Sequence, residues 1–390
     1  MRLRSTTTSS LPSTMGTYFD KITDLNALYR AFMMCRVGTN WKESVQRYEA
    51  NLFTNLRQLQ KKLLDGSYQQ LPFVEFELNE RGRRRHIKSM HISDRVVQRA
   101  LCDEVLAPAL LNSLCYDNSA SIKNKGVSFA RRRMQCHLDR YIRQHGVNGY
   151  ILKVDFSKFF DNIDHEIALK QVADRIDDPQ LLALVEKLIA SFRIGVTEED
   201  YHYYQSRPIN LLELKPVKGS KWMLNRSLGI GSQLSQIFGV VFPAPIDHHI
   251  KVARQCKYFG RYMDDFYVIH HNKAFLQQLL IEIKAIAKDL KLFVNDKKTS
   301  ITPLKRGFTY LKVRYDITPS GKVTRRLTPD SFTRERRRLK KYRKFVGKTM
   351  TFREVANAYQ SWRGMATKFK THRSVRKMDQ LYTQLFVEGD

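Results

Sequence analysis

The chain has 390 residues, 42% of them hydrophobic, which is enough apolar material for one large domain or two to three smaller ones. Its 68 Lys and Arg against 38 Asp and Glu give a formal net charge of +30, too lopsided for a merely soluble basic protein, and predict a polyanionic partner. The absence of any run of about 18 apolar residues excludes a membrane span. Five scattered cysteines are typical of buried thiols in a reducing cytoplasm.

Two regions precede the first expected strand. Residues 1–16 are rich in Ser and Thr, lack the apolar block of a secretory signal, and are predicted to be a disordered leader. Residues 17–67 are predicted to be helical, because apolar residues recur at spacings of three and four and Gly66 ends the last helix. The positions that set this spacing are Val45, Tyr48, Leu52, Leu56, Leu59 and Leu63.

Residues 83–98 combine a basic strand with the start of a helix. Arg83 and Arg85 are predicted to lie on a hairpin and to bind phosphate groups, because guanidinium groups bind phosphate in a bidentate way. A basic turn that touches a template backbone is the alternative. Asp94 is the predicted N-cap of the following helix.

A β-type run, Tyr150–Val154, ends at Asp155. Further on, Asp161 and Asp164 are interpreted as helix-start residues rather than ligands. A pair of helices is expected next. The segment at about 193–225 is rich in Tyr, Pro and charged residues and is expected to be irregular.

The stretch Phe259–Ile269 places Asp264 and Asp265 between two strand-like runs, at the tip of a hairpin whose flanks are apolar. Buried charges need partners, and clustered aspartates most often bind a hard divalent cation. Asp155 supplies a third carboxylate from a neighbouring strand, and the absence of a His/Cys cluster disfavours zinc. Two metal ions shared by three aspartates suit in-line attack on a phosphorus atom.

The last part of the chain, 325–386, contains a strongly basic helical segment. A solvated surface is the plain interpretation of such a run. The alternative is a helix that follows a nucleic-acid backbone through counterion release. The candidate nucleic-acid-binding residues are Arg336, Arg337, Lys340, Lys341 and Lys344.

Taken together, these blocks resemble a known family. Tyr262-Met263-Asp264-Asp265, with Asp155-Phe-Ser-Lys-Phe-Phe160 upstream, resembles the palm of prokaryotic reverse transcriptases, and the likeness covers roughly residues 65–370. Further blocks appear in the family's order: Tyr116-Asp-Asn-Ser-Ala-Ser-Ile-Lys-Asn-Lys-Gly126, Arg226-Ser-Leu-Gly229-Ile230-Gly231 and Tyr359-Gln-Ser-Trp362-Arg-Gly364.

The resemblance implies an α+β right-hand polymerase fold with helical fingers, an antiparallel-sheet palm and a helical thumb. The N-terminal helices and fingers would span residues 17–148. The palm would span 149–315, with an insertion at about 193–225, and the thumb 316–390.

The implied reaction is RNA-directed DNA polymerisation, in which a primer 3′-hydroxyl attacks the α-phosphate of a dNTP. Two Mg²⁺ ions, or Mn²⁺, would be held by Asp155, Asp264 and Asp265, with the Phe156 carbonyl as an added ligand. Phe160 would act as an aromatic gate against the 2′-hydroxyl of ribonucleotides; a core Phe is the alternative.

The remaining implied contacts lie around the nucleotide. Arg83 and Arg85 would clamp the triphosphate of the incoming nucleotide. Ile230 and Gly231 would lie beneath the nascent base pair, and Ile230 stands where many members have Gln, which predicts low accuracy. Lys298 would meet the leaving pyrophosphate; a plain surface Lys is the alternative.

The implied partners are an RNA template or structured non-coding RNA, a DNA product and dNTPs, with no membrane. The chain resembles free-standing bacterial enzymes of diversity-generating retroelements and of anti-phage defence. Two other functions stay open from the residues: a template-independent or protein-primed DNA polymerase on the same palm, and a nucleic-acid-binding scaffold without catalysis.

Overall fold

The structure is a computed structural model that describes residues 17–80 and 82–387, without the side chains of Glu80 and Arg83. The predicted leader, 1–16, lies outside the described residues. The chain forms two compact units, each built from three segments. The first contains Met1–Leu114, Ser157–Pro245 and Ile286–Phe293, and the second contains Cys115–Phe156, Ile246–Ala285 and Val294–Asp390.

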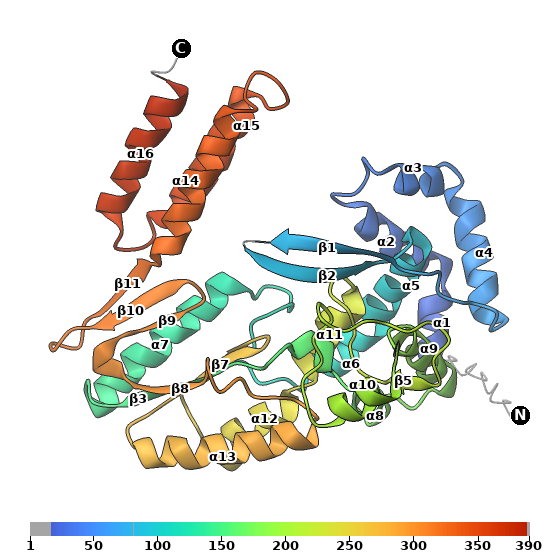
Figure 1. The fold of residues 1–390 in the computed structure, drawn as a ribbon, viewed down its shortest axis with the longest axis horizontal. Helices are drawn as coiled ribbons and strands as arrows, with labels where there is room; N and C mark the ends of the chain where they lie inside the picture. The colour runs from blue at the N-terminus through green and yellow to red at the C-terminus, as the bar shows by residue number, and fades with distance from the viewer. Residues whose placement is uncertain (1–16, 81, 388–390) are drawn as a thin grey trace, which may run out of the picture. The chain divides into compact units, whose positions relative to one another are not determined.

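The first unit is mainly helical (Figure 1). The predicted apolar spacing is confirmed, because Leu56, Leu59 and Leu63 are buried, and Gly66 follows the helix with a φ of 74°. The helices before residue 115 are α1 (Tyr18–Thr23), α2 (Leu25–Arg36), α3 (Glu43–Ala50), α4 (Leu52–Leu64), α5 (Ile92–Leu101), the π-helix η1 (Cys102–Leu106) and α6 (Ala107–Leu111).

Asp94 is not an N-cap, contrary to the prediction. Helix α5 begins at Ile92, and His91 is its N-cap. The Asp94 carboxylate is buried instead and accepts hydrogen bonds from the Tyr68 hydroxyl at 2.8 Å and the Leu71 amide at 3.1 Å. Asp94 therefore fastens the chain before the hairpin to the helix after it.

Residues 157–245 of the first unit form a second group of helices. Asp164 caps α8, since its Oδ1 accepts from the Ile167 amide at 3.2 Å, which confirms its interpretation as a helix-start residue. The elements are the 3-10 helix η2 (Phe159–Asn162), α8 (His165–Ala173), α9 (Pro179–Ala190), β4 (Ile194–Val196), α10 (Glu198–Gln205), β5 (Trp222–Leu224) and α11 (Gln233–Val241).

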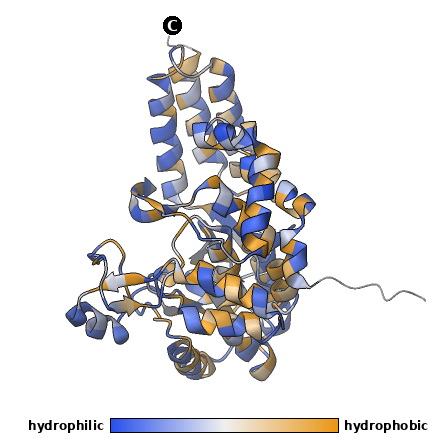
Figure 2. Cartoon of the chain, turned by 90° about the vertical axis from the view of Figure 1, so that its right-hand side faces the viewer, coloured by the Kyte–Doolittle hydropathy of each residue, from blue (hydrophilic) through white to orange (hydrophobic). Residues whose placement is uncertain are grey.

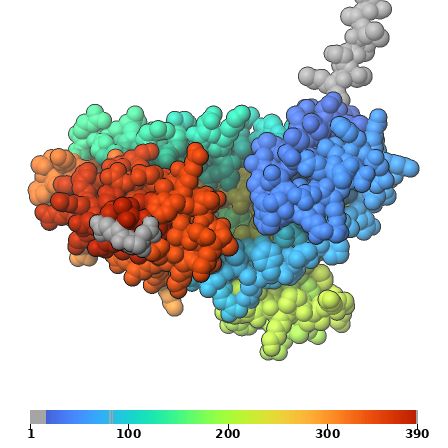
Figure 3. All heavy atoms as spheres, turned by 90° about the horizontal axis from the view of Figure 1, so that it is seen from above, coloured from blue at the N-terminus to red at the C-terminus, as the bar shows by residue number. Residues whose placement is uncertain are grey.

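The segment 193–225 is irregular only in part: residues 206–221 form neither helix nor strand, whereas 194–205 and 222–224 contain ordered elements. Strands β4 and β5 pair in antiparallel fashion, and α10 lies between them in the chain. Figure 3 shows the residues near 200–220, in yellow-green, protruding from the surface of the first unit. A small core of its own explains this order, and its members are Ile194, Val196, Tyr204, Ile209, Leu214 and Leu224.

The second unit contains a four-stranded antiparallel sheet in the order β6-β7-β3-β8. Helix α7 packs on this sheet (Figure 1). Its buried Met134, Leu138 and Tyr141 share one core with Ile151 and Tyr267. The elements are α7 (Val127–His145), β3 (Tyr150–Val154), the π-helix η3 (His249–Ala253), β6 (Phe259–Tyr262), β7 (Asp265–His270) and β8 (Ser300–Pro303). Helices α12 (Ala244–His248) and α13 (Lys273–Asp289) contribute residues to both units.

A second sheet and three helices complete this unit. The sheet order is β11-β10-β9, and α14 packs against α16. In Figure 2 the helices beneath the C-terminus are hydrophilic along much of their length, with hydrophobic residues at intervals. The elements are the 3-10 helix η4 (Leu304–Arg306), β9 (Phe308–Tyr310), β10 (Val313–Ile317), β11 (Val323–Leu327), α14 (Pro329–Arg343), α15 (Phe352–Ala366) and α16 (His372–Phe386).

A two-stranded antiparallel hairpin also belongs to the first unit. Strands β1 (Val74–Glu80) and β2 (Arg83–Ser89) pair along their whole length in the first unit, as the basic strand predicted. In the described part of the chain, no helix is both long and apolar enough to cross a membrane.

Candidate active site

Three carboxylates come together at one end of the four-stranded sheet, as the sequence predicted. Strand β3 pairs with β7 in a register that joins Val154 to Phe266. The next residues in that register are Asp155, directly after β3, and Asp265, the first residue of β7. Asp264 lies in the turn between β6 and β7. Tyr262 and Asp265, on either side of the turn, are the last pair of the β6–β7 ladder.

The turn itself is held in a strained conformation by a buried ion pair. Met263 has a φ of 55°, a left-handed backbone conformation that costs a non-glycine residue about 1–3 kcal/mol. The Arg261 guanidinium donates to the Met263 carbonyl at 3.0 Å and also binds both oxygens of Asp247, with distances of 2.9 Å and 2.6 Å. Both side chains of this pair are only 1% exposed. The Arg261–Asp247 pair therefore fixes the backbone that presents Asp264 and Asp265.

The Arg261–Asp247 pair also contacts the segment that contains Asn118. Its side-chain amide donates to Asp247 at 2.9 Å. The backbone pairs as well, since the Ser119 amide donates to the Arg261 carbonyl at 3.1 Å and the Arg261 amide donates to the Asp117 carbonyl at 3.2 Å. Asn118 and its neighbours thus extend the edge of the sheet beside β6.

The electrostatics of the cluster disfavour ionised Asp265. Burial raises the pKa of Asp265 to about 6, against the lowering effect of Lys153, and the nearby carboxylates of Asp264 and Asp155 raise it further. Lys298 balances part of the charge, because its Nζ lies 2.8 Å from Asp155 Oδ1. The segment that carries Lys298 is tied to the same strand end, since the Asn295 amide donates to the Asp155 carbonyl at 2.8 Å.

The nucleotide-side candidates lie in the first unit, where several of them meet. The Leu228 amide donates to the Phe160 carbonyl at 3.2 Å, and Ile230 forms an isolated parallel bridge with Ile87 of β2. Phe160 is half-buried in η2, and its ring stands edge-on to that of Phe159. The loop 228–231 therefore connects the basic hairpin to the segment that follows Asp155.

Two glycines make this loop possible. Gly229 has a φ of 61°, and an added Cβ would lie 2.9 Å from the Phe192 ring. Gly231 has a φ of 119°, and its added Cβ would come within 3.8 Å of Ile87. Both positions require a backbone conformation that side-chain-bearing residues rarely adopt.

The predicted triphosphate clamp is described only in part. Arg83 and Arg85 both lie on β2, as expected. The Arg83 side chain lies outside the described residues, and Arg85 is half-buried.

The five basic candidates of the last segment gather on one face. Arg336, Arg337, Lys340, Lys341 and Lys344 are all exposed, the last of them as the C-cap of α14. The opposite face of α14 buries Phe332, Glu335 and Leu339. The spacing of four residues between exposed pairs follows from helical periodicity.

Residues 78–315 match the family model described as "Reverse transcriptase (RNA-dependent DNA polymerase)", which is more than half of the chain. The chain belongs to the reverse transcriptase family. This membership confirms the predicted α+β right-hand polymerase fold and the enzyme class, an RNA-directed DNA polymerase that transfers nucleotides, with RNA as template and DNA as product.

Two further proteins are similar to this reverse transcriptase. Protein YkfC of Escherichia coli (strain K12) is 23% identical over 295 residues, which cover 67% of this chain and 71% of YkfC. A solved structure of telomerase from Candida albicans, in complex with the TWJ fragment of telomeric RNA, is 13% identical with a TM-score of 0.45. That match covers 80% of this chain and 55% of the telomerase chain, so the reverse transcriptase spans about half the length of that protein.

Members of this family generally use divalent metal ions. Within the residues that the structure describes, no group of three His, Cys, Asp or Glu side chains is already arranged to hold one. The donor chemistry nevertheless fits a hard cation, because three carboxylates lie at one end of the sheet and carboxylate oxygens are ligands of such ions. Phe156, the predicted carbonyl ligand, follows Asp155 and forms an isolated bridge with Val294.

Sequence reasoning missed the residues that support the reverse transcriptase turn. Arg261 stands between Gly260 and Tyr262 in an otherwise apolar strand, and an unexplained charge in such a strand is a usable signal of a buried partner. Its partner Asp247 is 14 residues away in the sequence, and no pattern around it marks the pairing. Lys153 was likewise not singled out, although it lowers the pKa of Asp265.

Proposed function

We propose that this reverse transcriptase extends a primer 3′-hydroxyl with dNTPs at Asp155, Asp264 and Asp265, with two Mg²⁺ ions as cofactors and Mn²⁺ as an alternative. The observation that carries the proposal is the convergence of the three carboxylates at one end of the β3–β7 pair. When bound, the ions would supply Lewis-acid activation of the attacking oxygen and charge stabilisation of the leaving group.

The residues of the chain supply positioning and electrostatics. Asp155 and Asp265 sit on adjacent strands, so their spacing is set by the sheet rather than by a loop. Arg261 holds the Met263 carbonyl and so limits the movement of Asp264. Lys298, whose ammonium already neutralises Asp155, is in reach of negative charge in this cluster, which supports its assignment as the group that meets the leaving pyrophosphate.

Nucleotide selection is assigned to the first unit. The link between the 228–231 loop, β2 and η2 supports Phe160 as the sugar gate and Ile230 with Gly231 as the floor beneath the base pair. Arg83 and Arg85 are proposed to bind the triphosphate from β2. The exposed basic face of α14 supports a thumb that follows the duplex backbone. The proposal keeps the division into N-terminal helices and fingers (17–148), palm (149–315) and thumb (316–390).

The decisive experiment is Mg²⁺-dependent incorporation of a dNTP on an RNA template with an annealed DNA primer. The D264A/D265A variant should fall to background, because both donors at the turn are removed. A D174A/D177A variant, which loses two exposed carboxylates in the first unit, serves as the matched control and should incorporate at the wild-type rate. Normal incorporation by D264A/D265A would contradict the assignment of these aspartates.

We assign the enzyme to a dedicated template or structured non-coding RNA, in anti-phage defence or a diversity-generating retroelement. We assign it to the cytoplasm because all five cysteines are free thiols, which is typical of a reducing compartment. The genomic neighbourhood separates the two roles. A template and variable repeat pair would indicate diversity generation, whereas a structured RNA gene alone would indicate defence.

A further inference from the structure

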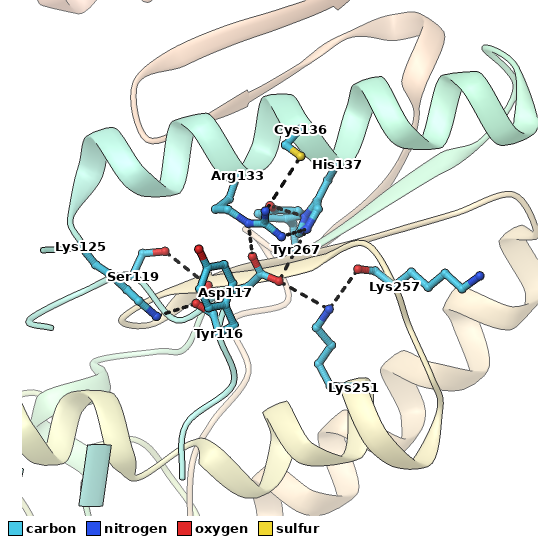
Figure 4. Close-up of polar contacts among 10 residues, drawn as sticks. All are labelled: Tyr116, Asp117, Ser119, Lys125, Arg133, Cys136, His137, Lys251, Lys257 and Tyr267. Atoms are coloured by element: carbon cyan, nitrogen blue, oxygen red, sulfur yellow. Dashed lines mark hydrogen bonds and ion pairs between the residues drawn. The ribbon is translucent and has the colours of Figure 1, made fainter. Parts of the chain in front are cut away.

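A basic pocket lies in the second unit, lined by none of the candidate catalytic residues. It has a volume of about 680 Å³, within the range of about 300–1,000 Å³ that is typical of ligand sites. Helix α7, η3 and the residues just before β6 form its walls (Figure 4). Its lining includes the side chains of Arg133, Arg140, Arg143, Lys251, Lys257 and Tyr258.

The charge of this pocket, which we call the α7 pocket, is strongly positive. Five of its lining side chains are Arg or Lys, and none is acidic. The carboxylate that contacts them is Asp117, whose side chain is 4% exposed and lies at the base. Its oxygens are 2.5 Å from Arg133 Nε and 3.5 Å from Lys251 Nζ. One buried carboxylate therefore orients two cations and leaves the pocket with excess positive charge.

The base of the pocket is preorganised by a neutral histidine. Burial lowers the pKa of His137 to about 4, and Arg133 and Lys251 lower it further, against the opposing effect of Asp117. The His137 Nε2 accepts from Arg133 Nη2 at 3.1 Å, so its Nδ1 donates to the Tyr267 hydroxyl at 3.0 Å. Tyr267 belongs to β7, two residues after Asp265, so the pocket rests on the strand that carries the catalytic turn (Figure 4).

The mouth of the pocket suits a phosphate backbone rather than a base. Arg140, Arg143 and Lys257 are exposed around it, and guanidinium groups bind phosphate oxygens in a bidentate way. The aromatic residue of the lining, Tyr258, is 8% exposed, and its hydroxyl donates to Gln144 at 2.7 Å. Because this ring is covered, the pocket offers charge to a ligand but no platform for base stacking.

We propose that the α7 pocket binds the phosphodiester backbone of a folded RNA segment, at a second site outside the catalytic cluster. Backbone contacts of this kind are independent of sequence and position the nucleic acid. The identification of RNA as the source of the phosphodiester rests on the proposed function. Binding of a phosphodiester chain by the pocket does not.

The first test compares two variants that lose the same charge. R140Q/R143Q/K257Q removes the mouth of the α7 pocket, and R57Q/K61Q/K62Q removes three exposed cations from α4 as the control. Dissociation constants for an RNA hairpin are measured across a salt series, without dNTPs or divalent ions. The slope of log affinity against log salt should fall by about 2–3 in the pocket variant, because each lost phosphate contact removes about 0.7–0.9 from it. It should not change in the control.

The second test needs no variant. Acetylation of lysines in the wild-type protein, followed by mass spectrometry, should show Lys257 protected when the hairpin is added, with Lys61 equally reactive in both states. Primer extension on a short template should be retained by the pocket variant.

The outcomes separate this proposal from the polymerase assignment, because binding is measured without chemistry. Protection of Lys257 in a protein that incorporates no dNTP would uphold the pocket and overturn the polymerase assignment. An unchanged salt slope, an equal loss in the α4 control, or an unprotected Lys257 would overturn the pocket. Tighter binding to DNA of the same sequence, or an effect confined to phosphatidylserine vesicles, would overturn RNA as its ligand.

Discussion

Replacing Asp247 with Asn should destabilise the protein by about 3–5 kcal/mol. Arg261 and Asp247 are each 1% exposed and share hydrogen bonds of 2.6–2.9 Å, so D247N removes the counter-charge that Asp247 supplies to a buried guanidinium. Incorporation of dNTPs should slow as well, because Arg261 would be free to leave the Met263 carbonyl.

A double variant separates stability from positioning. R261M/D247L replaces the ion pair with apolar side chains of similar volume, a change that is often neutral or stabilising when both charges go. Most of the lost stability should return. Activity should not, because the tether from Arg261 to Met263 is missing and the turn with φ of 55° is no longer held.

The measurements are urea unfolding followed by circular dichroism, and single-turnover incorporation of one dNTP. Glu282→Gln is the control, because the Arg254–Glu282 pair is also bidentate but its side chains are 35% and 21% exposed. Partly exposed pairs contribute about 0–1 kcal/mol. A cost for D247N no larger than that of E282Q, or full activity in R261M/D247L, would refute the reasoning.

Three further predictions concern the catalytic cluster and the nucleotide. The pKa of Asp265 is about 6 in the folded protein and ordinarily 3.8, so its ionisation removes stability progressively between about pH 4 and pH 6, and the full loss persists above pH 6. At about 1.36 kcal/mol for each unit between the two pKa values, the loss is up to about 3 kcal/mol. D265N should therefore stabilise the metal-free protein at pH 8 in urea unfolding, with a gain that shrinks toward pH 4; no gain at pH 8 would contradict the burial argument. Phe160→Ala should admit ribonucleotides if the half-buried ring is the sugar gate, and an unchanged rNTP/dNTP preference would make it a core residue. Ile230→Gln should lower the error rate by up to about tenfold, since a hydrogen bond to the nucleotide contributes about 0.5–1.5 kcal/mol. Equal error spectra in the sequenced products of both proteins would show that Ile230 does not set the error rate.

Local patterns predicted the catalytic strands because the information is local. The β-type run before Asp155 and the two runs around Asp264 and Asp265 each mark a strand end, and antiparallel pairing brings such ends together. The basic face of α14 was equally visible, because helical spacing follows from the order of residues alone. Asp164, an expected helix-start residue, is the N-cap of α8.

Features that depend on distant partners escaped prediction. Asp94 has the chemistry of an N-cap, but its carboxylate accepts hydrogen bonds from Tyr68 and Leu71 instead. The helix starts two residues before Asp94. The pairing of Arg261 with Asp247 depends on where α12 meets β6, which no periodicity specifies. Similarly, the polar residues of 193–225 suggested an irregular segment, while its few apolar residues form a core only after the chain has folded back on itself.

The paired ends of that segment bear on how the enzyme can change over evolution. Ile194 and Leu224 are partners in the β4–β5 ladder, so this lobe of the first unit begins and ends at adjacent points. Insertions between such points are tolerated, because each doubling of a flexible loop adds only about 0.6 kcal/mol of closure entropy. Changes in loop length within this lobe should leave α9 and the 228–231 loop in place, provided that the buried hydrogen bond from the Ile209 amide to Asn162 is kept. The same property makes it a suitable position for grafting a reporter domain.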